Sequence, residues 1–232
     1  MDSPKKIARI AGALYLIVVL SGLIHLMYVP SVINSTDPIQ TLANITSNQQ
    51  LFRLGILAGI VCYAAFLFLP IVLYRLLSPI NKTHAVAMVT LALVSVPLSF
   101  VNMLHKFAVL TLINAQPALS ADQIQTQVTL QLEYYGNGIQ LTSIFWGLWL
   151  LPFGYLVFRS GFLPKVLGIF LMMGCFGYTV NFVGGFLSTS YSETIIPSIL
   201  SIPSALGEIG ICLWLLIVGV RNVNVNPSPV TA

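Results

Sequence analysis

The placement of its few charged side chains is the feature that most constrains how this chain can fold. Of ten Lys and Arg residues, eight fall at four places along the sequence. They are Lys5, Lys6 and Arg9; Arg75 and Lys82; Arg159 and Lys165; and Arg221. The intervals between these places are apolar and long enough for a helix to cross a bilayer, turn and return. This spacing predicts a polytopic membrane protein.

Composition excludes the main alternative, a soluble globular domain. Only 7% of the 232 residues are charged and 57% are hydrophobic, with a mean hydropathy of +0.92, whereas soluble domains are about 25% charged. The net charge of +4 raises the question of nucleic acid binding. Because the basic residues lie at the ends of apolar runs, and not in runs interleaved with aromatics, they suit lipid head groups. Membrane lipids are therefore expected partners, and nucleic acid is not.

Six apolar segments meet the requirement of roughly 20 residues for a membrane-spanning helix. They are residues 10–29, 51–73, 85–112, 135–158, 166–187 and 195–220. The connections 78–83 and 159–165 are basic, whereas 30–50, 114–132 and 188–194 contain acids and no Lys or Arg. Because basic loops stay on the cytoplasmic side, this alternation predicts an all-α transmembrane bundle with cytoplasmic N and C termini. Residues 1–221 are expected to form a single domain, followed by a flexible cytoplasmic tail, 222–232.

Local signals refine this outline. Ser120 followed by Gln123 is typical of a helix start with a capping box, so the fourth span is expected to extend outward from its apolar segment. Gly55 and Gly59 form a small-xxx-small pair, which favours close packing within the chain but leaves a homo-oligomer open. Four prolines lie inside spans and are expected to kink them. They are Pro70, Pro97, Pro152 and Pro203.

The polar residues inside the spans are the best indication of function, because ionisable groups in a membrane usually face a bundle interior or a cavity. Asn102, His105 and Lys106 are spaced to share one helix face. Helix direction places most of the set in the outer leaflet, with Glu208 near mid-membrane. The sequence thus predicts one outer-leaflet polar pocket. Its expected ligand-binding residues are His25, Arg53, Asn102, His105, Lys106, Glu133, Asn137, Asn181 and Glu208.

The sequence is also compatible with two other roles for these residues. Arg53 or Lys106 can pair with Glu133 or Glu208 and serve only helix assembly. Alternatively, Glu208 and His105 can act as acid and base. The sequence lacks H-x-x-x-H, H-E-x-x-H and paired-Asp patterns, so no metal and no cofactor is expected.

Several segments resemble the domain of unknown function 4386 family, uncharacterised multi-pass membrane proteins of bacteria. The segments that carry the resemblance are 9–12, 51–56, 135–136, 154–168, Gly207 with Glu208, and 213–216. The resemblance implies a bacterial inner-membrane location and marks Arg53 and Glu208 as family-pattern residues. It supplies no established activity.

Three functional hypotheses follow. The leading one is a protein that binds a small polar, anionic or lipid-like ligand in the outer-leaflet pocket, in a transporter-like or sensor-like role. The second is an intramembrane enzyme acting on a lipid or isoprenoid. The third is a structural or accessory subunit whose charges serve helix assembly.

Overall fold

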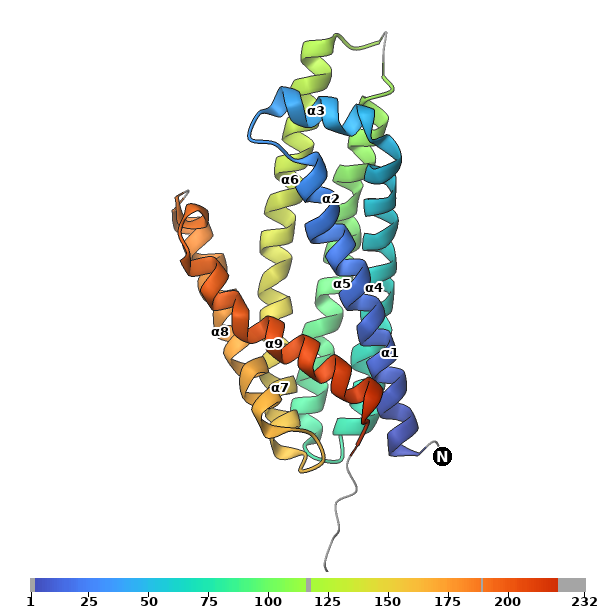
Figure 1. Ribbon diagram of the computed structural model, residues 1–232, viewed down its shortest axis with the longest axis vertical. Coiled ribbons are helices and arrows are strands. Elements are labelled where there is room, and N and C mark those ends of the chain that lie inside the picture. The colour runs from blue at the N-terminus through green and yellow to red at the C-terminus, as the bar shows by residue number, and fades with distance from the viewer. Residues whose placement is uncertain (1–2, 116–117, 189, 221–232) are drawn as a thin grey trace, which may run out of the picture.

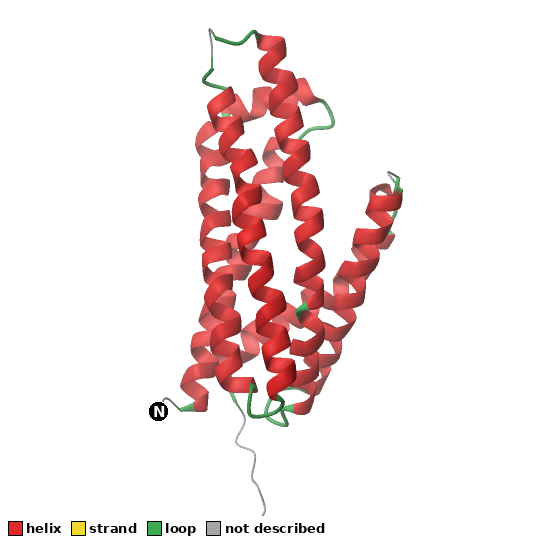
Figure 2. Cartoon of the chain, turned by 180° about the vertical axis from the view of Figure 1, so that it is seen from behind, coloured by secondary structure: helices red, strands yellow, loops and turns green. Residues whose placement is uncertain are grey.

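The computed structural model describes residues 3–115, 118–188 and 190–220, and the regular secondary structure within them is all helical (Figures 1 and 2). The elements in order are α1 (Pro4–Leu23), the π-helical η1 (Ile24–Tyr28), α2 (Val29–Ile33), α3 (Pro38–Ser47), α4 (Gln49–Leu77), α5 (Lys82–Leu112), α6 (Ala121–Leu148), α7 (Leu150–Arg159), α8 (Lys165–Leu187), the 3-10 turn η2 (Tyr191–Glu193) and α9 (Ile196–Ile217).

The six predicted spans are confirmed in the described part of the chain. Six helical stretches are long and apolar enough to cross a membrane. The first is longer than its apolar core, since α1, η1 and α2 continue as one helical stretch from Pro4 to Ile33. The fourth begins at Ala121, as the capping signal predicts: the Ser120 and Gln123 side chains bond each other's backbone N–H groups.

Most of the basic residues gather at one end of the bundle, here named the basic end. Arg75 lies in the last turn of α4 and Lys82 begins α5, while Arg159 ends α7 and Lys165 begins α8. The N-terminal helix starts at this end (Figure 1), and Gly219 packs against Lys5. The first and last described segments therefore meet at the basic end. Arg221 and the predicted tail 222–232 lie outside the described residues.

The bundle is longer than a bilayer is thick. At 1.5 Å per residue, the 31 residues of α5 span about 46 Å, whereas the hydrocarbon core of a membrane measures about 30 Å. The far end of α5, together with α3 and the start of α6 (Figure 1), therefore extends beyond the hydrocarbon region. The 23 residues of α8, by contrast, span only about 35 Å.

Pro152 causes a break in the fourth span. It lacks the N–H that would bond the carbonyl of Leu148, and α6 ends at Leu148 before α7 begins at Leu150. Trp149 at the break is 1% exposed. It stacks on Phe153 and meets Phe66 edge to face, with centroid separations of 5.0 and 5.1 Å. This aromatic group anchors the core of the basic half.

Helices α8 and α9 form a pair that leans away from the rest of the bundle toward the far end (Figures 1 and 2). Close approaches at glycine fix the pair: a Cβ on Gly177 would collide with the Leu200 carbonyl. Near the basic end, a Cβ on Gly12 of α1 would collide with the backbone of Leu216. The pair is thus tied to α1 at one end and diverges from the bundle at the other.

Candidate functional site

Lys106 is a buried cation on α5. It is only 5% exposed, and its Nζ lies 4.3 Å from the ring centroid of Tyr135 and 5.8 Å from that of Phe52. Within the described residues it has no carboxylate partner in an ion pair. Two aromatic faces offset only part of the cost of taking an ammonium group out of water, about 0.5–2 kcal/mol each against several. Lys106 therefore carries a charge that its surroundings do not balance.

His25 lies beside this cation and is fully buried. Its Nδ1 is 2.7 Å from the carbonyl oxygen of Gly55, and its Nε2 is 2.7 Å from the hydroxyl of Tyr135. Because a carbonyl can only accept, Nδ1 carries the hydrogen and donates it to Gly55. In that tautomer Nε2 accepts from the Tyr135 hydroxyl. Both ring nitrogens are thereby satisfied.

The π-helical segment η1 carries His25. Its register appears in the bond from the Val29 N–H to the carbonyl of Ile24, five residues earlier. Pro30 follows at once and has no N–H to restore the α-helical pattern. Such π-bulges are rare and are frequent at functional sites. Hydropathy predicts the span but not this change of register.

Tyr135 is the residue that joins these groups. Its hydroxyl bonds His25, its ring lies under Lys106, and its carbonyl accepts a 2.9 Å hydrogen bond from Nδ2 of Asn102. Asn102 fits against α6 because residue 138 is a glycine, where any Cβ would collide with the Asn102 side chain. Of the expected site residues, the structure thus brings His25, Asn102 and Lys106 together around a tyrosine.

A cavity of about 240 Å³ opens beside these side chains. Its lining is mostly apolar and contains Lys106 as the only charged residue among those described. The residues are His25, Leu26, Val29, Pro30, Ile33, Asn34, Phe52, Lys106, Leu132, Tyr135, Gly136 and Ile139. We call this cavity the Lys106 pocket. It is smaller than the roughly 300–1,000 Å³ typical of pockets for drug-sized ligands, so it suits a small group.

The structure places the other expected residues outside the lining of the Lys106 pocket. Arg53, Glu133 and Asn137 are exposed. Glu133 lines a second hollow, against Asn34 and Thr41, which shares Asn34 and Leu132 with the Lys106 pocket. The reason is helical rotation: successive residues turn by about 100°, so Arg53 points away when its neighbour Phe52 faces Lys106.

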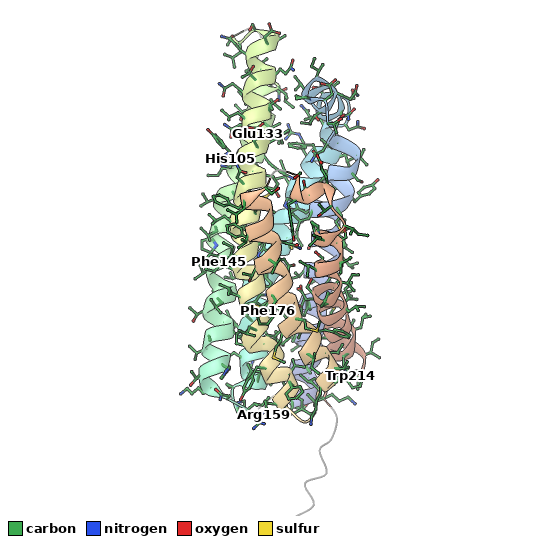
Figure 3. The ribbon with its side chains drawn as sticks, turned by 90° about the vertical axis from the view of Figure 1, so that its left-hand side faces the viewer. His105, Glu133, Phe145, Arg159, Phe176 and Trp214 are labelled. Carbon is green, nitrogen blue, oxygen red and sulfur yellow. The ribbon has the colours of Figure 1, made fainter. Side chains whose placement is uncertain are left out.

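His105 also lies outside the Lys106 pocket. It is half-buried, and its Nδ1 is 2.7 Å from Oε1 of Gln131. Figure 3 shows His105 and Glu133 toward the far end, opposite Arg159. His105 and Glu208 line no common cavity in the described part of the chain, so the geometry does not support them as an acid–base pair.

Glu208 and Asn181 belong to a second region, between α6, α8 and α9. The Tyr15 hydroxyl donates to Oε2 of Glu208 at 3.1 Å. Asn181 donates to the Pro197 carbonyl and the Ser201 hydroxyl, each at 3.2 Å, and accepts from Tyr191 at 2.8 Å. No described base lies within ion-pair distance of Glu208. The pairing of Arg53 or Lys106 with Glu133 or Glu208 is therefore not seen.

Tyr135, Phe52 and Tyr15 are absent from the expected set of site residues, although Tyr135 and Phe52 lie in segments that carry the family resemblance. On α6 the polar stripe containing Glu133 and Asn137 faces outward, and Tyr135 between them turns inward. The signal available in the sequence is Gly138, which permits the close approach of Asn102. No group of three His, Cys, Asp or Glu among the described residues is placed to hold a metal ion.

The fold and these cavities define a class: a multi-pass α-helical membrane protein with a buried cation and a half-buried carboxylate in separate regions of the bundle. The chain belongs to the family described as domain of unknown function (DUF4386), which matches residues 10–219. This match confirms the resemblance seen in the sequence. No curated protein and no solved structure matches the chain.

Proposed function

We propose that the protein binds a small anionic ligand in the Lys106 pocket, in a transporter-like or sensor-like role in the bacterial cytoplasmic membrane. The ligand is either a free anion or the head group of an acidic lipid. The observation that carries the proposal is Lys106 itself, 5% exposed and lining a cavity, with no carboxylate partner among the described residues.

The uncompensated charge of Lys106 is the physical reason to expect an anionic ligand. Breaking a buried ion pair by removing one partner costs about 3–5 kcal/mol because a charge is left uncompensated. Lys106 is such an uncompensated buried charge, with only two aromatic rings beside it. An arriving carboxylate or phosphate would supply the missing charge and accept hydrogen bonds from the ammonium group. The nitrogens of His25 are already occupied, so Lys106 is the donor available to the ligand.

The position of the pocket suits this ligand. Lys106 lies 24 residues beyond Lys82, or about 36 Å along α5, just past the roughly 30 Å of hydrocarbon. With the basic end in the cytoplasm, as the positive-inside rule favours, the pocket lies at the outer head-group level. An acidic head group in the outer leaflet or an anion from outside can reach it there.

The substitution Lys106→Met tests the proposal, because methionine keeps an unbranched chain and removes the charge. The protein is reconstituted in nanodiscs of phosphatidylcholine and titrated calorimetrically with dioctanoyl phosphatidic acid or with inorganic phosphate. We expect Lys106→Met to weaken binding at least about tenfold, the equivalent of roughly 1.4 kcal/mol. Arg53→Gln is the matched control: it removes an exposed base at the far end of α4 and should leave the affinity unchanged.

The two probes separate the two sources of the anion. Binding of both, with phosphate displacing the lipid, indicates a free-anion site. Binding of the lipid alone indicates a head-group site. Equal affinities for the parent protein, Lys106→Met and Arg53→Gln would contradict the proposal, as would the absence of binding by either probe.

A further inference from the structure

Two cavities meet at Glu208, and neither belongs to the Lys106 pocket. The first, of about 420 Å³, lies between α6, α8 and α9. Its lining is rich in amide, hydroxyl and carboxylate groups: Gln140, Ser143, Tyr178, Asn181, Phe182, Ser201, Ser204, Ala205 and Glu208. We call it the polar compartment.

The second cavity, of about 270 Å³, lies between α1, α4, α6 and α9 and is lined mainly by apolar side chains, including Val18, Leu23, Phe66 and Trp149. We call it the apolar compartment. It shares Tyr178, Ala205 and Glu208 with the polar compartment. Glu208 therefore stands at the boundary between a space suited to a polar head and a space suited to a hydrocarbon tail.

The charge in the two compartments favours a cationic head group. Among the described residues, Glu208 is the only charged one in either lining, and no base lies within ion-pair distance of it. Tyr15 donates to one of its two oxygens. The ring of Tyr178 lines both compartments, and an aromatic face beside a carboxylate attracts an ammonium group. The Glu208 carboxylate would repel an anionic head group.

The depth of the site points to arrival through the membrane. Glu208 lies nine residues before the end of α9 at Ile217, about 14 Å along the helix from the basic end and thus within the hydrocarbon region. The α8–α9 pair leans away from the remaining helices above this level (Figures 1 and 2). A ligand with an apolar tail can enter here from the lipid phase without crossing the packed core.

We propose that the cleft at Glu208 binds a cationic amphiphile, with its ammonium head in the polar compartment against Glu208 and its tail in the apolar compartment. This site is separate from the Lys106 pocket and takes the opposite charge, so the two proposals can fail independently.

Tryptophan fluorescence provides the test, because Trp146 and Trp149 line the apolar compartment. Three probes share a terminally brominated dodecyl tail, which quenches tryptophan, and differ in the head: trimethylammonium, maltoside or sulfate. They are titrated into the full-length protein in phosphatidylcholine vesicles. We expect saturable quenching at the lowest concentration with the ammonium probe. Equal quenching by all three, or tighter binding of the sulfate, would overturn the proposal.

Substitutions test whether the preference for the ammonium probe arises at Glu208 in the cleft. Glu208→Gln should weaken binding of the ammonium probe at least about tenfold and leave the maltoside probe unchanged. Glu193→Gln, an exposed acid in the turn before α9, is the matched control and should bind as the parent does. Lys106→Met should also leave ammonium binding unchanged, which separates this result from the anion site.

A second substitution keeps the test decisive if Glu208→Gln does not fold. Ala205→Leu adds volume where the two compartments meet and leaves Glu208 in place. We expect Ala205→Leu to weaken binding of the ammonium probe severalfold. Unchanged ammonium binding in Ala205→Leu would place the probe elsewhere and overturn the proposal.

Discussion

At the scale of single residues, the position of His25 depends on Gly59 of the neighbouring helix α4. A Cβ on Gly59 would lie 2.7 Å from Cε1 of the His25 ring, closer than packed carbon atoms approach. The hydrogen bond from Nδ1 to Gly55 depends on that proximity. The Gly55–Gly59 pair is therefore used within the chain, against Val29 and His25 of the first span, and this face does not need a second copy.

The substitution Gly59→Ala should therefore destabilise the protein. The added methyl displaces the His25 ring and its two hydrogen bonds, and overpacking of this kind costs about 1–3 kcal/mol. Thermal unfolding in detergent, followed by circular dichroism, measures the effect. Gly136→Ala is the matched control, because a Cβ there meets nothing within 4 Å and alanine favours a helix by about 1 kcal/mol. Equal melting temperatures for the two variants would contradict this role of Gly59.

The sequence predicts which residues are costly to bury better than it predicts where each side chain points. Lys106, His25 and Asn102 do meet, as their depth suggests. Arg53 and Glu133 share that depth but face outward, since rotation about the helix axis depends on packing against neighbours. The π-helical segment Ile24–Tyr28 rotates the helix faces on its two sides relative to each other. A hydropathy pattern does not reveal this rotation, so the contact of His25 with Tyr135 could not be predicted from the sequence.

At the scale of elements, the residue at which α6 begins is marked by a local signal in the sequence. Its capping box joins Ser120 and Gln123, in the part of the helix that extends beyond the hydrocarbon region. Local signals of this kind depend on a few adjacent residues, which explains why the sequence predicts this boundary. The break at Trp149 has an equally local cause in Pro152.

The substitution Ser120→Ala should loosen this first turn. Loss of the cap costs about 1 kcal/mol, so amide hydrogens of the first turn of α6 should exchange severalfold faster. Hydrogen–deuterium exchange read by mass spectrometry measures this. Thr126→Ala, an exposed site on the same helix, is the control and should leave exchange at the first turn unchanged. Unaltered exchange in Ser120→Ala would show that the cap does not hold the helix start.

At the scale of the whole molecule, the number of spans follows from hydropathy, but the separation of Lys106 and Glu208 into different regions of the bundle does not. The lean of α8 and α9 arises from close helix approaches such as Gly177 with Leu200 and Gly12 with Leu216. These contacts join residues distant in the sequence. Glu208 and Lys106 consequently lie in different cavities, a division that only tertiary packing determines.

Orientation is a property of the whole molecule that labelling can test. In a background lacking Cys62, Cys175 and Cys212, single cysteines replace Asp122 or Lys82, both exposed in the structure. Because the basic end should face the cytoplasm, a membrane-impermeant maleimide added to intact cells should label Asp122→Cys and not Lys82→Cys. Labelling of Lys82→Cys from outside would reverse the orientation and move the Lys106 pocket to the inner face.

If Lys106 binds an external anion, a high-resolution structure of the protein in nanodiscs containing dioctanoyl phosphatidic acid shows it most directly. We expect density for the phosphate above the Tyr135 ring, within about 4 Å of the Lys106 Nζ, and no such density in Lys106→Met. A carboxylate of the chain itself on Nζ, or a pocket without ligand density at saturating probe, would contradict the claim.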